Sequence, residues 1–279
     1  MRLRMLAVCL LAATAPLFTA AQNIENAKVT TTDASRGAGA AIASLSRSGA
    51  AWFAWKVPIE GQSLCCWTGN SSSGRCGRCF LDGHDGMTIN RDEPGEPRTA
   101  GEMLLLVRVE EGRVRRVRYF DAGCTLDGQG NTIHLLSGVT PESSIDYFRS
   151  QIANADNEGN LVAAISLHAH AKVVPLLIDL ARHDANHQVR RHAIFWLGQK
   201  AGDKAAGELR RAVDEDPDDD VRKHAVFAIS QLPRERAVPM LIDLVKNHKS
   251  REVRKRAIFW LAETEDPRAL QLIEEILGK

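Results

Sequence analysis

The chain has 279 residues, and 36 lysines and arginines face 35 aspartates and glutamates, which gives a formal net charge of +1. A chain this close to neutral lacks the positive field that gathers nucleic acid, so general nucleic-acid binding is excluded. The length is sufficient for one large domain or two ordinary ones.

The first 21 residues have the layout of a secretory signal peptide. Arg2 and Arg4 precede the apolar run Met5–Phe18, and small residues lead to a cleavage site after Ala21. A membrane anchor is disfavoured because this run is short for a bilayer core of about 30 Å. We expect export to the periplasm or the extracellular space and no stable membrane span after cleavage. The loss of both arginines leaves 34 basic against 35 acidic residues, a net charge of −1.

Residues 22–48 are rich in small and polar side chains. Little apolar surface is available in this segment to offset the conformational entropy that is lost when a chain becomes ordered. Ala38–Leu45 has the composition of a short helix. We nevertheless expect residues 22–48 as a whole to be a flexible arm.

Residues 49–139 predict a small domain rich in strands and loops. Strand-like apolar runs occupy Trp52–Val57, which stops at a proline, Met103–Val109, Val114–Phe120 and Ile133–Leu136. The turn Glu110–Arg113 predicts a hairpin between the second and third runs. Four arginines make one face of the third run basic: Arg113, Arg115, Arg116 and Arg118.

Cysteines are the natural staples for a domain with so thin a core. Of six cysteines, one lies in the signal peptide, and the other five are Cys65, Cys66, Cys76, Cys79 and Cys124. Disulfides persist in an oxidising compartment, and an odd number leaves one thiol over. The sequence does not determine which cysteines pair.

Two other readings of this Cys-rich segment stay open. Four of the cysteines lie close together between Cys65 and Cys79 and end in Cys-x-x-Cys, a pattern that can hold a tetrahedral zinc ion. Zinc is the only cofactor that the sequence suggests. Cys76 and Cys79 could instead form a redox pair, although such pairs usually start a helix and no helical pattern follows here.

From residue 140 onward the chain predicts one helix after another. Thr140–Glu142 has the cap, proline and acid of a helix start. One stretch then recurs at a constant spacing, as Val189–Leu197, Val221–Ile229 and Val253–Leu261. A fixed period of this size indicates stacked repeats. Each unit also holds an earlier amphipathic segment, and a degraded unit precedes them, so we expect about four repeats over residues 140–279.

Matched residues in these units resemble the HEAT-repeat family, in the short bacterial form similar to the repeats of bilin (PBS) lyases. They include the prolines Pro175 and Pro239 in the first helices and a Val-Arg pair that opens each second helix. The resemblance implies a mainly α fold, with an α–α solenoid after the small β domain. It also implies bonds between neighbouring repeats in a ladder of Asp184, Arg190, Asp216, Arg222 and Arg254.

This sequence departs from the family pattern at two positions. His248 stands where the aspartate ahead of Arg254 is expected, and Gly207 replaces a proline. We therefore expect the ladder to be weaker between the last repeats. The half of the chain before residue 140 carries no family signature.

A helical wheel of the repeated stretch separates core positions from outward ones, at about 100° per residue. The apolar arc of the first copy contains Val189, Ala193, Ile194, Trp196 and Leu197. Basic and aromatic residues recur on the polar side: Arg191, His192, Phe195, Lys223, His224, Phe227, Lys255, Arg256 and Phe259. In the HEAT family the second helices line the concave face, so we expect this stripe to bind another protein, by an acidic or extended segment. The alternative is that the phenylalanines pack against their neighbours.

Enzymatic function is disfavoured because the sequence lacks Gly-x-Ser-x-Gly, His-Glu-x-x-His and a phosphate-binding glycine loop. Several histidines raise the question of a metal site: His168, His170, His183, His187 and His192. The linker between His183 and His187 breaks helical spacing, so we expect no metal there. The sequence thus predicts an exported, non-enzymatic interaction scaffold, with a thiol or metal function of the cysteines as the alternative.

Overall fold

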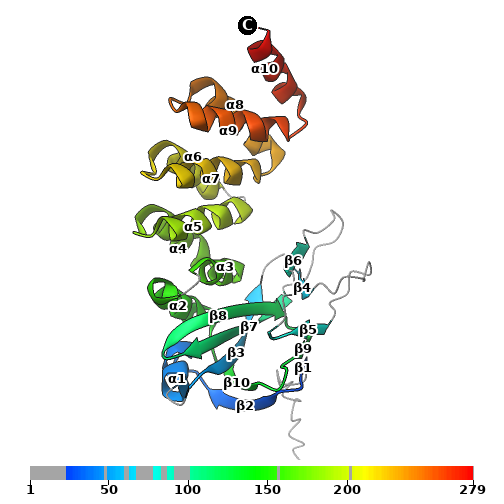
Figure 1. The fold of residues 1–279 in the computed structure, drawn as a ribbon, viewed down its shortest axis with the longest axis vertical. Helices are drawn as coiled ribbons and strands as arrows, with labels where there is room; N and C mark the ends of the chain where they lie inside the picture. The colour runs from blue at the N-terminus through cyan, green and yellow to red at the C-terminus, as the bar shows by residue number, and fades with distance from the viewer. Residues whose placement is uncertain are drawn as a thin grey trace, which may run out of the picture.

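A computed structural model describes residues 23–46, 49–59, 63–66, 78–82, 87–90, 101–155, 158–200 and 203–278. The predicted signal peptide lies outside these residues. The chain forms a β part followed by a column of stacked helices, with the helices α2 and α3 directly above the sheet (Figure 1). Among the described residues, no helix combines the length and the hydropathy that crossing a membrane requires.

The β part is built on a mixed sheet with the strand order β2-β10-β3-β7-β8. The first three strands in this order are parallel, and β3, β7 and β8 are antiparallel. The predicted hairpin joins β7 to β8, with positive φ at Glu111 and Gly112, as its tight turn requires. The five strands are β2 (Lys28–Asp33), β3 (Ala51–Ile59), β7 (Gly101–Glu110), β8 (Arg113–Asp121) and β10 (Thr132–Ser137).

Smaller sheets flank this one. One has the order β1-β9-β5, and the other pairs β4 with β6. Their strands are β1 (Ile24–Glu25), β4 (Ser63–Cys66), β5 (Arg78–Phe80), β6 (Met87–Asn90) and β9 (Thr125–Asp127). Contrary to prediction, β3 continues through Pro58. This is possible because β10 pairs only with Trp52–Ala54, so β7 is the one strand of the sheet that pairs with Pro58. The Pro58 carbonyl also accepts a hydrogen bond from the Ala169 amide at 2.9 Å.

The prediction of a flexible arm over residues 22–48 is wrong for the part that the structure describes. Strand β2 forms an edge of the sheet by pairing in parallel with β10, which comes much later in the chain. Helix α1 (Ala38–Leu45) follows and buries Ala38, Ala41 and Ile42. The ordering entropy is offset by these distant contacts, which the local composition of the segment does not reveal.

The structure describes the side chains of two of the predicted cysteines, Cys79 and Cys124. Cys79 is disulfide-bonded. Cys79 and Cys124 are both buried in a second apolar cluster, on the opposite face of the sheet from the helices, with Trp52, Leu81 and Leu126. The side chains of Cys65 and Cys66, and all of Cys76, lie outside the described residues, so the pairing of the cluster stays a prediction.

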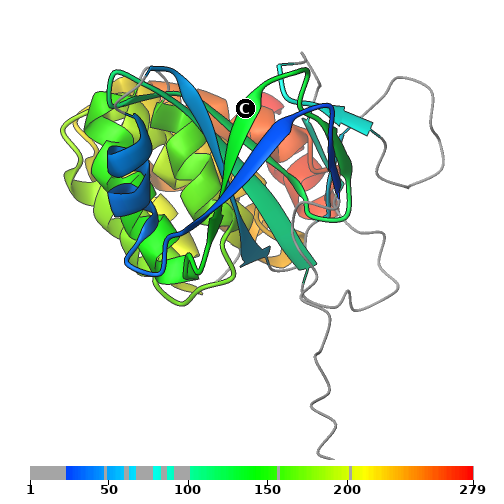
Figure 2. The same cartoon turned by 90° about the horizontal axis from the view of Figure 1, so that it is seen from below.

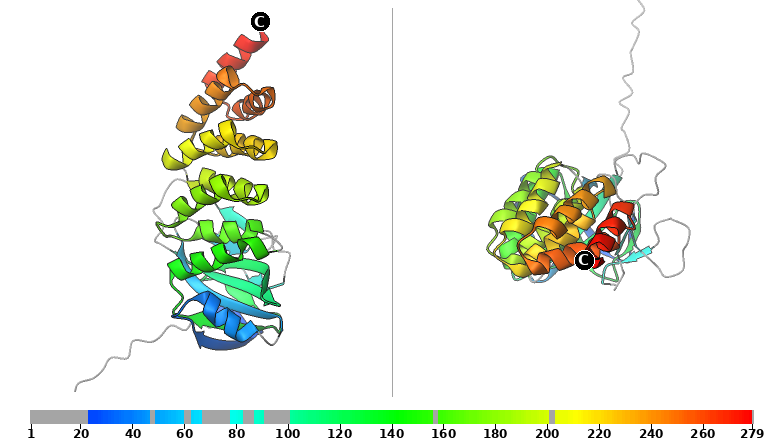
Figure 3. Two further views of the ribbon diagram at one scale, coloured as in Figure 1. Left: turned by 90° about the vertical axis from the view of Figure 1, so that its left-hand side faces the viewer. Right: turned by 90° about the horizontal axis from the view of Figure 1, so that it is seen from above.

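The predicted helical repeats are present. Thr140 caps the first helix by accepting a hydrogen bond at Oγ1 from the Ser143 amide, at 3.1 Å. The second helices of successive units, α3, α5, α7 and α9, pack against one another in a row, and the column is clearest in Figure 3. The helices are α2 (Pro141–Gln151), η3 (Ile152–Asn154), α3 (Glu158–Leu167), α4 (Val173–His183), α5 (His187–Lys200), α6 (Asp203–Glu215), α7 (Asp219–Ser230), α8 (Arg234–Asn247), α9 (Arg251–Ala262) and α10 (Pro267–Leu277).

A single apolar core runs from the sheet into the solenoid. Seen from below, the sheet lies across the end of the helical column (Figure 2). Trp55 of β3 packs against Phe148 of α2, with ring centroids 5.7 Å apart, and both side chains are fully buried. The first repeat is thus covered by the sheet rather than by solvent.

A neutral hydrogen-bond network closes this junction. The Trp55 indole donates to the Ser144 hydroxyl at 2.8 Å, and that hydroxyl is 2.9 Å from Nε2 of His168. Since Nδ1 of His168 lies 2.8 Å from the Ala164 carbonyl, it must carry the proton, and Nε2 accepts from Ser144. Burial lowers the pKa of His168 to about 4, which keeps the ring neutral.

Candidate partner-binding site

The repeated stretch places its apolar arc in the core, as the helical wheel predicts. Val189, Ala193, Ile194 and Leu197 are each no more than 1% exposed. Trp196 is also buried. The helix α5 approaches α7 closely at Gly198, where a β-carbon would lie only 2.9 Å from the Ala228 carbonyl oxygen. The second helices are therefore held at a fixed spacing, with their polar sides on one common face.

The predicted ladder contact is present between the second and third units. The Arg190 guanidinium donates two hydrogen bonds to the Asp216 carboxylate, at 3.0 and 3.1 Å, and both side chains are buried. The same guanidinium also donates to the Asp184 carbonyl at 3.0 Å. The Asp184 carboxylate instead lies 3.8 Å from Arg149 of α2. Arg190 thus ties its own linker to the next repeat.

The ladder does not continue to the next unit, in agreement with the departure at His248. Arg222 donates to the Asp216 carbonyl of its own linker and to the Asp219 carboxylate. Arg254 likewise donates to the His248 carbonyl at 2.7 Å. Both arginines thus bind within their own units. For Arg222 the reason is that position 248, the equivalent of Asp216 in the next unit, offers an imidazole where a carboxylate is needed.

The aromatic side chains of the stripe form a continuous stack, but not the row of three phenylalanines that the sequence predicts. Phe195 and Phe227 stack with their ring centroids 6.2 Å apart and their planes 10° from parallel. The next ring in the stack is Trp260, 4.9 Å from Phe227. Phe259 instead packs edge-on against Trp260 and is 51% exposed.

Trp260 is the site residue that the sequence does not reveal. Its counterpart Trp196, at the same repeat position, is buried, so the wheel assigns both to the core. Trp260 remains half-buried and turns toward Phe227. No local signal separates the two tryptophans, because the difference arises from what packs over each of them.

A surface pocket of about 380 Å³ lies over this stack, and we call it the solenoid pocket. It draws side chains from α5, α7 and α9, three successive second helices. Five of the nine predicted binding residues line it, whereas His192, Phe195, Lys255 and Phe259 do not. The lining residues used below are Arg191, Lys223, His224, Phe227, Arg256 and Trp260.

The two histidines of the stripe are neutral. His192 packs over α3 at Gly159, where a β-carbon would lie 2.6 Å from its Nε2. Its pKa is lowered by burial and by the nearby Arg191. Burial, with Arg191 and His192, lowers the pKa of His224 to about 4. The positive charge of the pocket therefore comes from its arginines and its lysine.

The cationic groups of the stripe differ in their partners. Lys223 lies 3.2 Å from the Asp220 carboxylate, which also lines the pocket. Lys255 lies 3.2 Å from Glu252. Arg191 and Arg256 form no ion pair with any residue in the described parts of the chain. These two guanidinium groups are the ones available to an anionic ligand.

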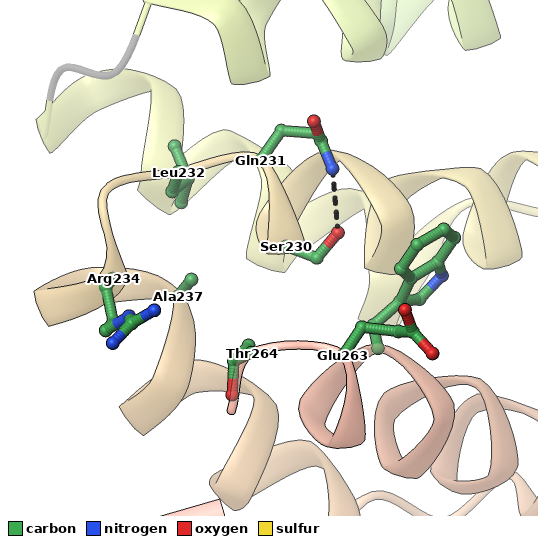
Figure 4. A pocket seen from close by; sticks show the side chains of 8 residues that line it. Ser230, Gln231, Leu232, Arg234, Ala237, Glu263 and Thr264 are labelled. Atoms are coloured by element: carbon green, nitrogen blue, oxygen red, sulfur yellow. Dashed lines mark hydrogen bonds between the residues drawn. The ribbon is translucent and has the colours of Figure 1, made fainter. Parts of the chain in front are cut away.

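A second, polar pocket of about 250 Å³ opens beside the first, between the end of α7 and the end of α9 (Figure 4). Ser230 and Gln231 lie on one side of it, joined by a hydrogen bond of 3.2 Å, and Glu263 and Thr264 lie on the other. Trp260 lines both pockets, so the two pockets share this side chain.

The histidines considered for a metal site are dispersed. His168 is buried in the junction network, and His183 lies 3.0 Å from Asp179. The exposed His187 contacts Gln188 at 2.7 Å. Within the described part of the chain, no three metal-ligating side chains converge.

The chain was compared with solved structures, curated proteins and family models. The complex of CpcE and CpcF of phycocyanin lyase from Nostoc sp. PCC7120 is one similar solved structure, at 18% identity and a TM-score of 0.35. The alignment covers 50% of this chain and 89% of that chain. A comparison with curated proteins gives no match. A family model described as HEAT repeats matches three overlapping segments, 145–230, 174–247 and 208–279. Residues 145–279 of this chain belong to the HEAT-repeat family.

Proposed function

We propose that the chain is an exported, non-enzymatic scaffold that binds another protein on the face formed by its second helices. The observation that carries this proposal is the solenoid pocket, where side chains from three successive repeats converge around an aromatic stack. HEAT repeats suit such a role because stacked units present one extended surface.

The chemistry of the pocket favours an acidic segment. Arginine binds a carboxylate through two parallel hydrogen bonds, and Arg191 and Arg256 enter the pocket from helices two repeats apart. Phe227 and Trp260 supply the aromatic surface on which an apolar side chain of the partner can pack. The neutral His224 can donate or accept a hydrogen bond without adding charge.

Charge reversal in the pocket tests the proposal. The mature chain, residues 22–279, and its Arg191→Glu/Arg256→Glu variant are immobilised and exposed to an extract of the exporting cell's envelope. We expect a specific protein to be retained by the wild type and lost from the variant. The variant should also bind the purified partner with an affinity at least tenfold lower than that of the wild type.

A matched control changes the same number of charges outside the pocket. Lys246 and Arg251 are exposed on α8 and α9 and do not line it, so Lys246→Glu/Arg251→Glu should retain the partner. If both variants lose the protein equally, the interaction depends on overall charge and the pocket is not the site. If the pocket variant still binds, the proposal is wrong.

Export is the second part of the proposal. It is supported by the arginines, apolar run and small residues at the start of the sequence. N-terminal sequencing of the protein purified from its own cells should begin at Gln22. A protein that retains Met1 and co-fractionates with the cytoplasm would contradict it.

We also propose that the cysteines are structural staples and that no cofactor is required. The disulfide of Cys79 supports this view. Because Cys124 is buried, a thiol count on the denatured but unreduced mature protein separates the alternatives, since disulfide staples leave one thiol. Four or more thiols would favour the zinc or redox role of the cysteine cluster instead.

A further inference from the structure

A third pocket lies on the basic strand β8, where the sheet meets the first repeat. It has a volume of about 330 Å³ and is lined by Val114, Arg115, Arg116, Val117 and Asn160. We call it the strand pocket. The two arginines come from the β part and the asparagine from α3, so the pocket joins the two halves of the chain.

The strand pocket and the solenoid pocket lie on the same face of the molecule. Asn160, His192, His224 and Arg256 occupy the same position in successive repeats. Asn160 lines the strand pocket, and His224 and Arg256 line the solenoid pocket. His192 lies between them, packed on Gly159 of α3. A ligand lying along the second helices would therefore meet both pockets.

The first repeat lacks the large side chains of the stripe. The positions of Arg191, His192 and Phe195 correspond, one repeat earlier, to Gly159, Asn160 and Ala163. This replacement leaves α3 without a cation of its own at the stripe. Strand β8 packs against α3 at this point and brings its guanidinium groups there. The β part thus supplies the charge that the first repeat has lost.

We infer that the binding face extends onto β8, and that the strand pocket takes a second carboxylate of the same acidic partner segment. This inference rests on the function proposed above. Successive helices are about 8–10 Å apart, so two steps from α3 to α7 span about 16–20 Å. An extended chain rises about 3.3 Å per residue, so the two acidic positions are separated by about five or six residues.

The arginines of the strand pocket lie near carboxylates that are themselves partly exposed. Arg115 lies 4.0 Å from the Glu110 carboxylate, and Arg116 lies 3.2 Å from Asp82. All four side chains are between 33% and 46% exposed. Ion pairs this exposed are weak, so an incoming carboxylate can compete with them or share the guanidinium donors.

A peptide fits this face better than a nucleic acid. Asp220 lines the solenoid pocket and Asp219 precedes it in the chain, and their side chains are 75% and 73% exposed. A nucleic acid carries a charge on every nucleotide and would be repelled at these positions. A peptide can place carboxylates only where the arginines are.

Fluorescein-labelled peptides of four and twelve residues test the inference by fluorescence anisotropy with the mature chain. The shorter peptide carries one glutamate, the longer one carries two glutamates about six residues apart, and all other positions are glycine or serine. The longer peptide can reach both pockets and the shorter one only a single pocket. We expect Arg115→Gln/Arg116→Gln to weaken binding of the twelve-residue peptide at least tenfold and to leave the four-residue peptide within about twofold of the wild type. Retained binding of the short peptide and an unchanged far-UV circular dichroism spectrum show that the variant is folded.

Matched variants separate this inference from the function on which it rests. Arg113→Gln removes one positive charge from β8 outside the pocket and should bind like the wild type. If Arg115→Gln/Arg116→Gln leaves the long peptide unaffected while Arg191→Gln/Arg256→Gln abolishes its binding, the extension is wrong and the proposed function stands. If the latter variant has no effect, or neither peptide binds, both are wrong. Tighter binding of a twelve-nucleotide oligothymidylate than of the long peptide would overturn the choice of a protein partner.

Discussion

Two junctions hold this molecule together. One is bonded by neutral polar side chains and the other by charged side chains, and the groups of both are buried. Where the sheet meets the first repeat, Trp55, Ser144 and His168 form a neutral chain of hydrogen bonds. Where α5 meets α7, Arg190 and Asp216 form a buried ion pair. The neutral network depends on the protonation state of one ring, and the ion pair depends on both of its charges. The two junctions should therefore fail under different perturbations.

The largest expected effect comes from breaking the ion pair. Asp216→Ala should lower the free energy of unfolding by about 3–5 kcal/mol, because the Arg190 guanidinium is left buried without its carboxylate. Urea titration followed by circular dichroism measures it. Asp219→Ala is the matched control, since Asp219 also pairs with an arginine but is 73% exposed, and it should cost at most about 1 kcal/mol. Equal effects would mean that the ladder contact does not stabilise the solenoid.

The neutral junction should fail in acid. Burial lowers the pKa of His168 from its ordinary 6.5 to about 4. Between these two values the unfolded chain binds a proton that the folded chain does not, so stability is complete above pH 6.5 and falls as the pH drops toward 4. The slope for this one group is about 1.4 kcal/mol per pH unit.

His168→Gln checks the origin of that slope. The glutamine cannot titrate, and its amide oxygen can accept the Ser144 hydrogen bond. Denaturant titrations of the variant between pH 6.5 and 4 should show a shallower loss of stability than those of the wild type. His224→Gln is a second test, because the pKa of His224 is also lowered to about 4, so this variant should likewise show a shallower loss of stability. An unchanged slope in the His168 variant would place the acid sensitivity elsewhere.

The smallest expected effects come from two glycines in the solenoid helices, Gly198 of α5 and Gly207 of α6. Gly198→Ala should destabilise the chain by about 1–3 kcal/mol, since the new methyl group meets the Ala228 carbonyl at 2.9 Å and forces α5 and α7 apart. Gly207→Ala, with no atom within 4 Å of the new β-carbon, should stabilise α6 by about 0.5–1 kcal/mol. Thermal unfolding of both variants shows whether each substitution raises or lowers the stability. A neutral Gly198→Ala would show that this close approach is adjustable.

The repeats and their ladder could be predicted because both follow from short sequence patterns that recur at a regular spacing. The constant repeat period, the Thr140 helix cap and the apolar arc of Val189 to Leu197 each depend on residues close together in the chain or on simple recurrence along it. Even the weakness of the ladder at the last repeats follows from one residue, His248. The turn at Glu111 and Gly112 likewise carries its own conformational signal.

The sequence by itself thus determined the solenoid, the hairpin and the side of each second helix that carries basic residues. Tertiary structure alone decided the rest, because those features depend on partners far away in the chain. Strand β2 is ordered by β10, and His192 is held by Gly159. Trp260 lines the pocket although its repeat counterpart Trp196 is buried. Identical local patterns acquire different roles when different neighbours pack over them.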